Sequence, residues 1–406
     1  MARSTYGWSE LSSADKREII GAIISGTAPR APRHVELDLT DRCNVACYFC
    51  NQQDLRTTQQ LSYHCAVRLV DELGAKGLRA VRLSGGGDPL FHPDAARILA
   101  HLNEVGIVID NVTTNAVGLT REIATLLADG NAREIVVSLN AADPADYHRM
   151  MAVKPDRFDR VVSNVSRLIE VRGQRTQPAV TLQFLLDREN FARLPEMYRL
   201  GRSLGVDRIA VTPVLEIPRD RVSKMLLLGP GDAATLEPYF REVLEADRDR
   251  LLFEPSYVFN WDGRLERLYA ELGVPVPNPY PIAETFKDAN SGCFFGWYSM
   301  VVTGNGDVRP CCYLLQPDYP SMGNVVEESV DAVWNGEAFA KMRQEMRDVL
   351  LAGEAAEYDG SKMKWLTPQC VELHACFLKN GYFRADADFY RDLGEALDRV
   401  RGAMEL

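Results

Sequence analysis

The sequence has 406 residues, of which 46% are hydrophobic and 25% are charged, and its formal net charge is −11. This length accommodates one large domain or roughly two to three ordinary domains, and the apolar fraction is ample for a packed core. An acidic chain without a basic run argues against a nucleic-acid partner, because binding to phosphates needs clustered Lys and Arg.

Targeting and redox features predict a cytoplasmic protein. The segment 1–10 has no apolar core of the signal-peptide type. No run of about 18 apolar residues occurs, so no membrane-spanning segment is expected. In the cytoplasm, nine cysteines are more readily interpreted as metal ligands and free thiols than as disulfides.

The first half of the chain alternates predicted strands and helices. An amphipathic helix over 12–25 and a proline-rich lead-in precede this alternation. The predicted strands cover 35–39, 80–84, 108–113, 134–139, 179–185 and 208–213. The predicted helices between them cover 63–76, 93–105, 121–129, 158–172 and 194–204. Successive βα units imply a parallel sheet with right-handed crossovers and helices on the outside.

The second half carries weaker patterns. Residues 216–290 are interpreted as a connector with a helix over 236–250 and a proline-rich stretch, which either borders the substrate pocket or is a plain linker. Residues 301–308 predict a hairpin with an Asn-Gly dipeptide at its turn. A final helix is expected over 388–404. The predicted divisions of the chain are 1–33, 34–215, 216–290, 291–385 and 386–406.

Three cysteines lie close together, directly after the first predicted strand. Cys43, Cys47 and Cys50 form the pattern C-x3-C-x2-C. Clustered thiolates are soft ligands that suit iron–sulfur clusters or zinc far better than magnesium or calcium. Three ligands on a cubane cluster would leave one iron open for a substrate or cofactor. The alternative is a zinc knuckle with a distant fourth ligand, although zinc sites more often contain C-x2-C pairs.

Other candidate functional residues also follow predicted strands. Gly85–Pro89 is a glycine-rich loop after the second strand, Asn115 follows the third, and Ser138 lies at the end of the fourth. Glycines allow a backbone to approach a ligand closely, but each motif alone is more readily explained as an ordinary turn or strand end. Together they converge on the carboxyl ends of the strands, where parallel α/β barrels place their active sites.

The cysteine pattern after a first strand resembles the signature of the radical S-adenosylmethionine (SAM) superfamily. This resemblance implies a partial (β/α)6 TIM-like barrel and a [4Fe–4S] cluster held by Cys43, Cys47 and Cys50. It also implies that SAM binds the open iron and is cleaved to methionine and a 5′-deoxyadenosyl radical. Such chemistry belongs to the cofactor, while the protein positions and shields it. An electron donor of the flavodoxin or ferredoxin type is the implied partner.

The strand-end motifs resemble the SAM-binding motifs of the same superfamily. Gly86–Pro89 resembles the G-G-E-P motif, whose backbone binds the SAM amino group, with Asp88 in place of the usual Glu. This departure shortens the carboxylate by one methylene, which leaves the backbone role in place and the side-chain role open. The SAM-binding residues that the resemblance implies are Phe49, Gly86, Gly87, Asp88, Pro89, Asn115, Ser138 and Asn140.

A second group of cysteines occurs in the second half of the chain. The C-x17-C spacing of Cys293 and Cys311, with G-x-G-x-V-x-P-C at the second cysteine, resembles the SPASM/twitch extension of radical SAM enzymes. This resemblance implies an auxiliary [4Fe–4S] cluster in a small twitch-like domain, with the ligands Cys293, Cys311, Cys370 and Cys376. A structural zinc site is the alternative.

The chain departs from the twitch pattern in two ways. Its last cysteine pair is C-x5-C rather than C-x2-C, and Cys312 is additional. Which of Cys311 and Cys312 binds iron therefore stays open, and Cys312 is a candidate iron ligand, a candidate hydrogen-atom donor or a bystander. Cys65 is interpreted as a buried, inert thiol.

These resemblances predict a radical SAM enzyme that removes a hydrogen atom from a small polar substrate. A sugar or aminocyclitol of antibiotic biosynthesis is the favoured substrate class, because the twitch pattern is similar to that of aminocyclitol-oxidising members. Dehydrogenation and epimerisation both stay open as outcomes. The alternatives are radical modification of a peptide or protein and a non-enzymatic iron–sulfur or zinc protein, which would not bind SAM.

Overall fold

The computed structural model describes residues 7–50, 52–53, 57–214, 225–250, 252–256, 259–275, 293–311, 319–353, 359–361, 363, 365–366 and 387–404. Its central feature is a nine-stranded sheet with the order β7-β6-β5-β4-β3-β2-β1-β8-β9. The strands are β1 (His34–Leu37), β2 (Ala80–Leu83), β3 (Val108–Thr114), β4 (Glu134–Ser138), β5 (Ala179–Leu186), β6 (Arg208–Pro213), β7 (Phe253–Pro255), β8 (Ser299–Val302) and β9 (Val308–Arg309). All neighbouring strands are parallel except β8 and β9, so the predicted parallel sheet is confirmed.

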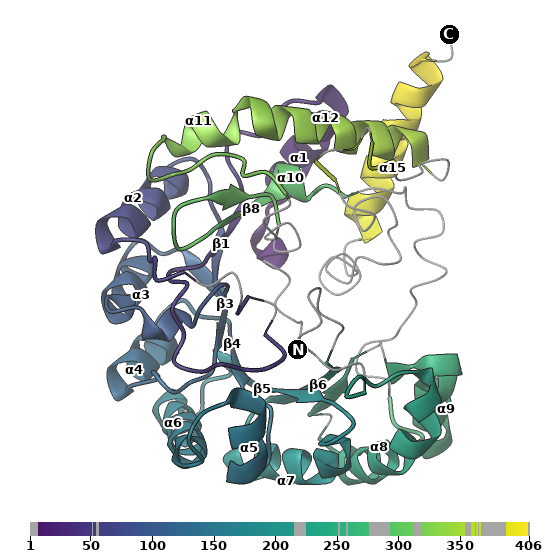
Figure 1. Ribbon diagram of the computed structural model, residues 1–406. Helices are drawn as coiled ribbons and strands as arrows, with labels where there is room; N and C mark the ends of the chain where they lie inside the picture. The colour runs from purple at the N-terminus through teal and green to yellow at the C-terminus, as the bar shows by residue number, and fades with distance from the viewer. Residues whose placement is uncertain are drawn as a thin grey trace.

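Helices form an outer arc around this sheet (Figure 1). Those that connect β1 to β6 are α2 (Tyr63–Gly74), α3 (Ala95–Glu104), α4 (Arg121–Asp129), α5 (Pro144–Met151), α6 (Asp156–Arg172) and α7 (Leu194–Leu204). The others are α1 (Ser13–Ser25), α8 (Ala233–Asp247), α9 (Arg264–Leu272), α10 (Phe295–Tyr298), α11 (Val330–Trp334), α12 (Glu337–Ala352) and α15 (Ala387–Met404). Helix α5 was not predicted from the sequence. None of the helices in the described ranges is long and apolar enough to cross a membrane.

Side chains alternate between the two faces of each strand, and this alternation makes the inner face of the sheet polar. Val35 and Leu37 of β1 belong to the hydrophobic core, whereas His34 and Glu36 point to the opposite face. In register, Glu36 is opposite Arg82 of β2. Central parallel strands are usually apolar on both faces, so a polar inner face suits a barrel that encloses a polar ligand.

Polar clusters at the amino end of the sheet are built from side chains that bind one another. His34 Nδ1 lies 2.8 Å from Ser299 Oγ, and His34 Nε2 lies 3.5 Å from Asp110 Oδ2. Arg208 Nη1 donates to Glu134 Oε1 at 3.0 Å. All five residues are buried. At this end of a barrel such contacts support stability rather than catalysis.

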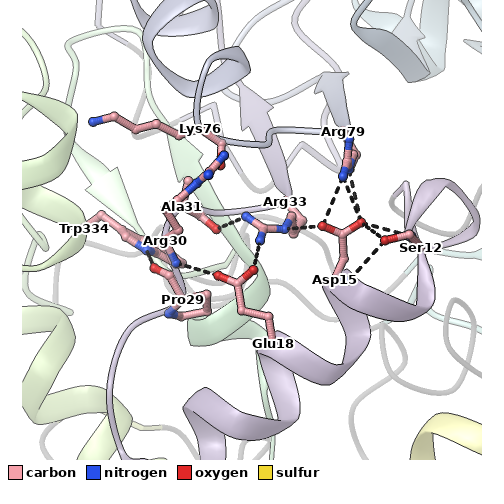
Figure 2. A network of polar contacts seen from close by, with 10 residues as sticks. All are labelled: Ser12, Asp15, Glu18, Pro29, Arg30, Ala31, Arg33, Lys76, Arg79 and Trp334. Atoms are coloured by element: carbon pink, nitrogen blue, oxygen red, sulfur yellow. Dashed lines mark hydrogen bonds and ion pairs between the residues drawn. The ribbon is translucent and has the colours of Figure 1, made fainter.

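The amino-terminal helix α1 is joined to the sheet by an ionic network (Figure 2). Ser12 caps the helix, because its side chain accepts from Asp15 N at 3.2 Å while Asp15 binds back to Ser12. Asp15 also accepts from Arg33 Nε at 2.9 Å and from Arg79 Nη2 at 3.1 Å. Arg33 directly precedes β1 and Arg79 directly precedes β2, so the network fixes α1 at the amino end of the sheet.

The carboxyl-terminal part of the chain continues the same sheet. β8 pairs with β1 in parallel, and β9 returns antiparallel to β8, which confirms the predicted hairpin. β7, inside the predicted connector, extends the opposite edge beside β6. The helix predicted over 236–250 begins three residues earlier, as α8, and the final predicted helix is confirmed as α15. The predicted divisions of the chain stay predictions.

Candidate active site

The loop that carries Cys43, Cys47 and Cys50 follows β1 at the carboxyl end of the sheet. Cys47 is buried, and the other two cysteines are half-buried against the hydrophobic core. Ala46 N donates to Met151 O at 3.0 Å, which fastens the loop backbone to the end of α5. The three predicted cluster ligands therefore share one anchored loop.

Asn115, at the end of β3, contacts this loop directly. Its Nδ2 donates to Asn44 Oδ1 at 2.7 Å and lies 3.6 Å from Cys43 Sγ. On the other side of the loop, Cys47 Sγ lies 3.5 Å from Met151 Sδ. The cysteine loop is thus positioned from both β3 and α5.

The glycine loop after β2 packs against the segment that leads into the cysteine loop. Gly85 has φ +115°, and a Cβ on it would lie 1.5 Å from Asp38 Oδ1. A Cβ on Gly87 would lie 2.1 Å from Arg42 O. Gly86 N donates to Asp38 Oδ2 at 3.2 Å. These glycines are therefore required for the contact between two loops, a role that the sequence analysis did not anticipate.

Asp88 has a defined side-chain role, although the sequence left that role open. The residue is buried, and its carboxylate accepts hydrogen bonds from Leu90 N at 2.9 Å, Thr114 Oγ1 at 2.9 Å and Asn115 N at 2.7 Å. It thereby joins the end of β2 to the end of β3. Because the Asn115 side chain contacts Asn44 and Cys43, Asp88 indirectly positions the cysteine loop.

Ser138 lies on the inner wall at the end of β4. It is half-buried and in register with Gln183 of β5, whose Nε2 donates to Thr212 Oγ1 of β6 at 3.1 Å. The three side chains form a polar row near the carboxyl ends of three adjacent strands. This row is placed to face a ligand inside the barrel.

Three further residues that were predicted to bind SAM make contacts within the protein. Asn140 is buried with φ +59°, its Oδ1 accepts from Leu185 N at 3.0 Å, and its amide therefore fixes the chain after β4. Phe49 packs edge-on against Tyr48 with ring centroids 5.3 Å apart. Pro89 is buried and begins a short 3-10 helix. The assignment of these residues to SAM stays a prediction.

Helix α5 and its partner at the end of β5 were not predicted from the sequence. Arg149 Nη1 donates to Asp187 Oδ2 at 3.0 Å, and Tyr48 of the cysteine loop donates to the same carboxylate. Asp187 is fully buried. The available signal was the Asp143-Pro144 dipeptide, because Asp is a favoured N-cap residue and Pro a favoured first helical residue.

Tyr147 is another residue of α5 that the sequence analysis missed. It is fully buried, and its hydroxyl has no hydrogen-bond partner among the described residues. Tyr147 lies one helical turn before Met151, which contacts Cys47. Burial raises the pKa of Tyr147, and the nearby Cys47 and Asp88 raise it further. A buried hydroxyl without a partner is costly, so this one suits a group bound beside the loop.

Two buried carboxyl groups, Glu36 in β1 and Asp38 directly after it, precede the cysteine loop along the chain. Burial raises the pKa of Glu36, although Arg82 and His34 partly oppose it. Burial and the neighbouring Glu36 raise the pKa of Asp38 well above its ordinary value. Burial therefore favours the protonated forms of both carboxyls, and a cationic group beside them would oppose this effect.

The second set of cysteines lies at the opposite end of the sheet. Cys293 precedes α10 and β8, and it is buried. Cys311 is half-buried and follows β9, whose Arg309 is opposite Val301 in the antiparallel pair. Both cysteines are therefore near the amino end of β8, which is also the amino end of β1. The extended chain from residue 34 to residue 39 separates the two cysteine sets. At about 3.3 Å per residue, it is roughly 16 Å long.

The remaining predicted cysteines, Cys312, Cys370 and Cys376, lie outside the described residues. The hairpin between the cysteines does reach the other end of the barrel. A Cβ on Gly304, in its turn, would lie 2.9 Å from Asp41 Oδ1. The hairpin thus spans from one cysteine set to the segment beside the other.

The donor set at the Cys43–Cys50 loop fits a [4Fe–4S] cluster. Three thiols in a half-buried, apolar setting are the usual ligands of such clusters. The unpartnered Tyr147 hydroxyl supplies a donor beside them. Within the described ranges, no three His, Cys, Asp or Glu side chains are arranged around a single ion, whereas in a cluster each thiolate binds its own iron.

Comparison with known families agrees with this geometry. The model of the radical SAM superfamily matches residues 37–201, and that of an iron–sulfur cluster-binding domain, SPASM, matches residues 293–354. The chain therefore contains a radical SAM domain and a SPASM domain. The radical SAM domain implies a [4Fe–4S] cluster with SAM, and the SPASM domain implies auxiliary iron–sulfur clusters.

Individual relatives are distant but cover most of this radical SAM protein. The AdoMet-dependent heme synthase of Methanosarcina barkeri is 24% identical over 319 residues, which are 77% of this chain and 85% of the relative. The PqqA peptide cyclase of Streptomyces rochei is 25% identical over 311 residues, or 75% and 76% of the two chains. Streptococcus suis SuiB bound to its precursor peptide SuiA has a TM-score of 0.57 at 19% identity, and the match covers 80% of this chain and 69% of SuiB.

Proposed function

We propose that this radical SAM enzyme abstracts a hydrogen atom from a peptide held inside the barrel, between its two cysteine sets. The observation that carries this proposal is the placement of Cys43–Cys50 and of Cys293 with Cys311 at opposite ends of the β1–β8 pair, with a polar inner wall between them. When bound, the cofactors supply a 5′-deoxyadenosyl radical at the carboxyl end and an electron acceptor at the amino end.

The protein's own residues would position these groups and the substrate. The Cys43, Cys47 and Cys50 thiols would hold the SAM cluster, and Cys293 and Cys311 would contribute to the auxiliary cluster. Asp88 and Asn115 would fix the loops around SAM, because they already join β2, β3 and the cysteine loop. Backbone atoms of the glycine loop and Ser138 would contact SAM. The inner strand positions would line the space for the substrate.

The peptide assignment draws on two relatives. The PqqA peptide cyclase and SuiB with its precursor peptide both act on or bind peptides. A polar wall suits an extended peptide, whose backbone offers donors and acceptors along its length.

A sugar or aminocyclitol is the second candidate, and one observation favours it. The Glu36 and Asp38 carboxyls are both buried, and they are close enough that the charge of Glu36 raises the pKa of Asp38. A substrate ammonium group beside them would favour their ionised forms and would compensate their burial. An amino sugar carries such a group without the bulk of a peptide.

The deciding experiment is anaerobic reconstitution with iron and sulfide, followed by a SAM-cleavage assay with dithionite. A short peptide encoded beside the gene and a panel of deuterated amino sugars would be offered separately. Peptide-stimulated deoxyadenosine with a mass loss of two hydrogens in the peptide is expected. Deuterium transfer from an amino sugar into deoxyadenosine, without any peptide effect, would replace the peptide assignment by the sugar. Absence of deoxyadenosine under every condition would contradict radical chemistry.

A further inference from the structure

A groove lined by arginines lies on the outside of the barrel, behind the cysteine loop. It has a volume of about 520 Å3 and lies where the β3–α4 loop meets α6. Figure 1 shows α4 and α6 side by side on the outer arc. The lining residues are Val117, Leu119, Thr120, Arg121, Arg160, Ser163, Asn164 and Arg167. Three of them are arginines and none is a carboxylate, which is distinctive in a chain of net charge −11.

The positive charges of this groove are weakly neutralised. Arg160 is exposed and has no hydrogen bond or ion pair within the described part of the chain. Arg121 is exposed, and its ion pair with Glu170 is long, at 3.8 Å. Arg167 donates to the neutral Asn164 Oδ1 at 2.8 Å. The groove therefore presents a positive potential to an approaching molecule.

The floor of the groove is joined to the cysteine loop through a single residue. Asn164 Nδ2 donates to Ala116 O at 2.8 Å, and Val117 N donates to Asn115 Oδ1 at 2.9 Å. The Nδ2 atom of the same Asn115 lies 3.6 Å from Cys43 Sγ. A molecule seated in the groove would thus be separated from a cluster ligand by one buried side chain and its flanking backbone.

We propose that this groove is the docking surface for an acidic protein that delivers single electrons to the cluster held by Cys43, Cys47 and Cys50. The proposal rests on the proposed function of these cysteines. In the docked complex, the reduced donor loses one electron and the cluster gains it, and no bond is made or broken at the groove. The chain has a net charge of −11, so most of its surface repels an acidic donor. The arginine groove, which no carboxylate lines, therefore favours the orientation in which the donor faces the cysteine loop.

The test compares two reductants on the reconstituted full chain. Deoxyadenosine formation is measured with a reduced flavodoxin over a range of concentrations, and separately with dithionite. Arg160→Glu is expected to raise the KM for flavodoxin by about tenfold or more, with no change in the dithionite rate. The double variant Arg121→Gln/Arg160→Gln should show a smaller rise and a weaker dependence on salt. Arg399→Glu on α15, also an exposed arginine, is the matched control and should behave like the wild type.

The possible results distinguish a docking surface from a substrate-binding or structural role of the groove. An unchanged flavodoxin KM in Arg160→Glu and in the double variant would overturn the proposal. An equal loss with dithionite would also overturn it, because the groove would then act on the SAM site itself. A change confined to the KM of an acidic peptide substrate would assign the groove to substrate binding instead. Wild-type protein that forms no deoxyadenosine with dithionite would contradict the proposed function, a result distinct from all of these.

Discussion

The two ends of the barrel sheet both bury polar residues but use them differently. At the amino end, side chains bind one another, as in the pairs Glu134–Arg208 and His34–Asp110. At the carboxyl end, Asp88 instead accepts backbone and hydroxyl hydrogen bonds that shape loops. Buried groups that pair with each other hold the fold, and those that fix loop backbones position a site. Asp187 at the carboxyl end combines both uses, because it binds the side chains of Arg149 and Tyr48 and also accepts from Glu189 N and Asn190 N.

Removal of the thiols at the carboxyl end should have the largest effect. The triple variant Cys43→Ala/Cys47→Ala/Cys50→Ala is expected to lose about four irons per chain and all SAM cleavage. The free energy of unfolding of the iron-free protein should change little, because two of the three thiols are only half-buried. Cys65→Ala, a buried cysteine of α2, is the control and should keep its iron. SAM cleavage that survives in the triple variant would disprove the cluster assignment.

Disruption of the Glu134–Arg208 pair at the amino end should lower stability rather than activity. Arg208→Met leaves the Glu134 carboxylate buried without its main cation, which costs roughly 3–5 kcal/mol. Chemical denaturation of the iron-free protein measures this loss. The double variant with Glu134→Gln should recover part of it. If Arg208→Met instead impaired SAM binding with unchanged stability, the contrast between the two ends would fail.

A change at Asp88 should affect both stability and SAM binding. Asp88→Asn weakens the hydrogen bonds from Thr114 and Asn115, and hydrogen bonds to a charged group are worth roughly 1.5–3 kcal/mol. Asp88→Glu keeps the charge and should lose less. Denaturation and equilibrium SAM binding would be measured on the same preparations. A normal SAM affinity in a destabilised Asp88→Asn protein would make this residue purely structural.

The Asp15 network at the amino end predicts a specific pH dependence. Burial raises the pKa of Asp15, but hydrogen bonds from Ser12 and the charges of Arg79 and Arg33 outweigh this effect, so the pKa lies below 3.8. A carboxyl with a depressed folded pKa contributes stability above its unfolded pKa and loses it as the pH falls through the folded value. The attachment of α1 should therefore weaken below about pH 4.

Unfolding free energies between pH 7 and pH 3 test this expectation. Asp15→Asn should lower stability at pH 7 and reduce its loss on acidification. Asp249→Asn, at an exposed position after α8, is the control and should leave both unchanged. An acid transition of the same depth in Asp15→Asn and in the wild type would show that other carboxyls dominate.

The sequence predicted the features that depend on local patterns. Strands β1 to β6, their helices and the cysteine loop follow from periodicity, breakers and spacing. The helix α5 carried a local signal that was overlooked, since Asp143-Pro144 precedes apolar residues at Tyr147, Met150 and Met151. Without this helix, Tyr147, Arg149 and Met151 were not predicted to lie near the cysteine loop.

Features that depend on distant partners could not be predicted. The pairing of β8 with β1 brings His34 and Ser299 together across 265 positions, and no local pattern encodes that register. Asp38 shows the same limit. Its importance comes from contact with Gly85 and Gly86, whereas a single Asp after a strand has no distinctive spacing.

The smallest predicted effect concerns two buried tyrosines, one whose hydroxyl has a hydrogen-bond partner and one whose hydroxyl has none among the described residues. The Tyr198 hydroxyl donates to Asp247 Oδ1 at 2.9 Å, whereas the Tyr147 hydroxyl has no partner among the described residues. In the iron-free protein, Tyr198→Phe should lose about 1.5 kcal/mol, while Tyr147→Phe should lose nothing or gain up to about 1 kcal/mol. Both variants keep the ring, so packing is matched.

Loading the protein with iron should reverse the sign of the stability change for Tyr147→Phe but not for Tyr198→Phe. If the hydroxyl binds the group held by the cysteine loop, Tyr147→Phe becomes destabilising in the reconstituted protein, and thermal unfolding of loaded and iron-free samples shows the change. Tyr198→Phe should lose the same amount in both states, because Asp247 is its partner in each. An equal loss in the iron-free state for both variants would mean that the Tyr147 hydroxyl finds its partner within the protein. The carboxyl end would then resemble the amino end, where buried polar groups bind one another.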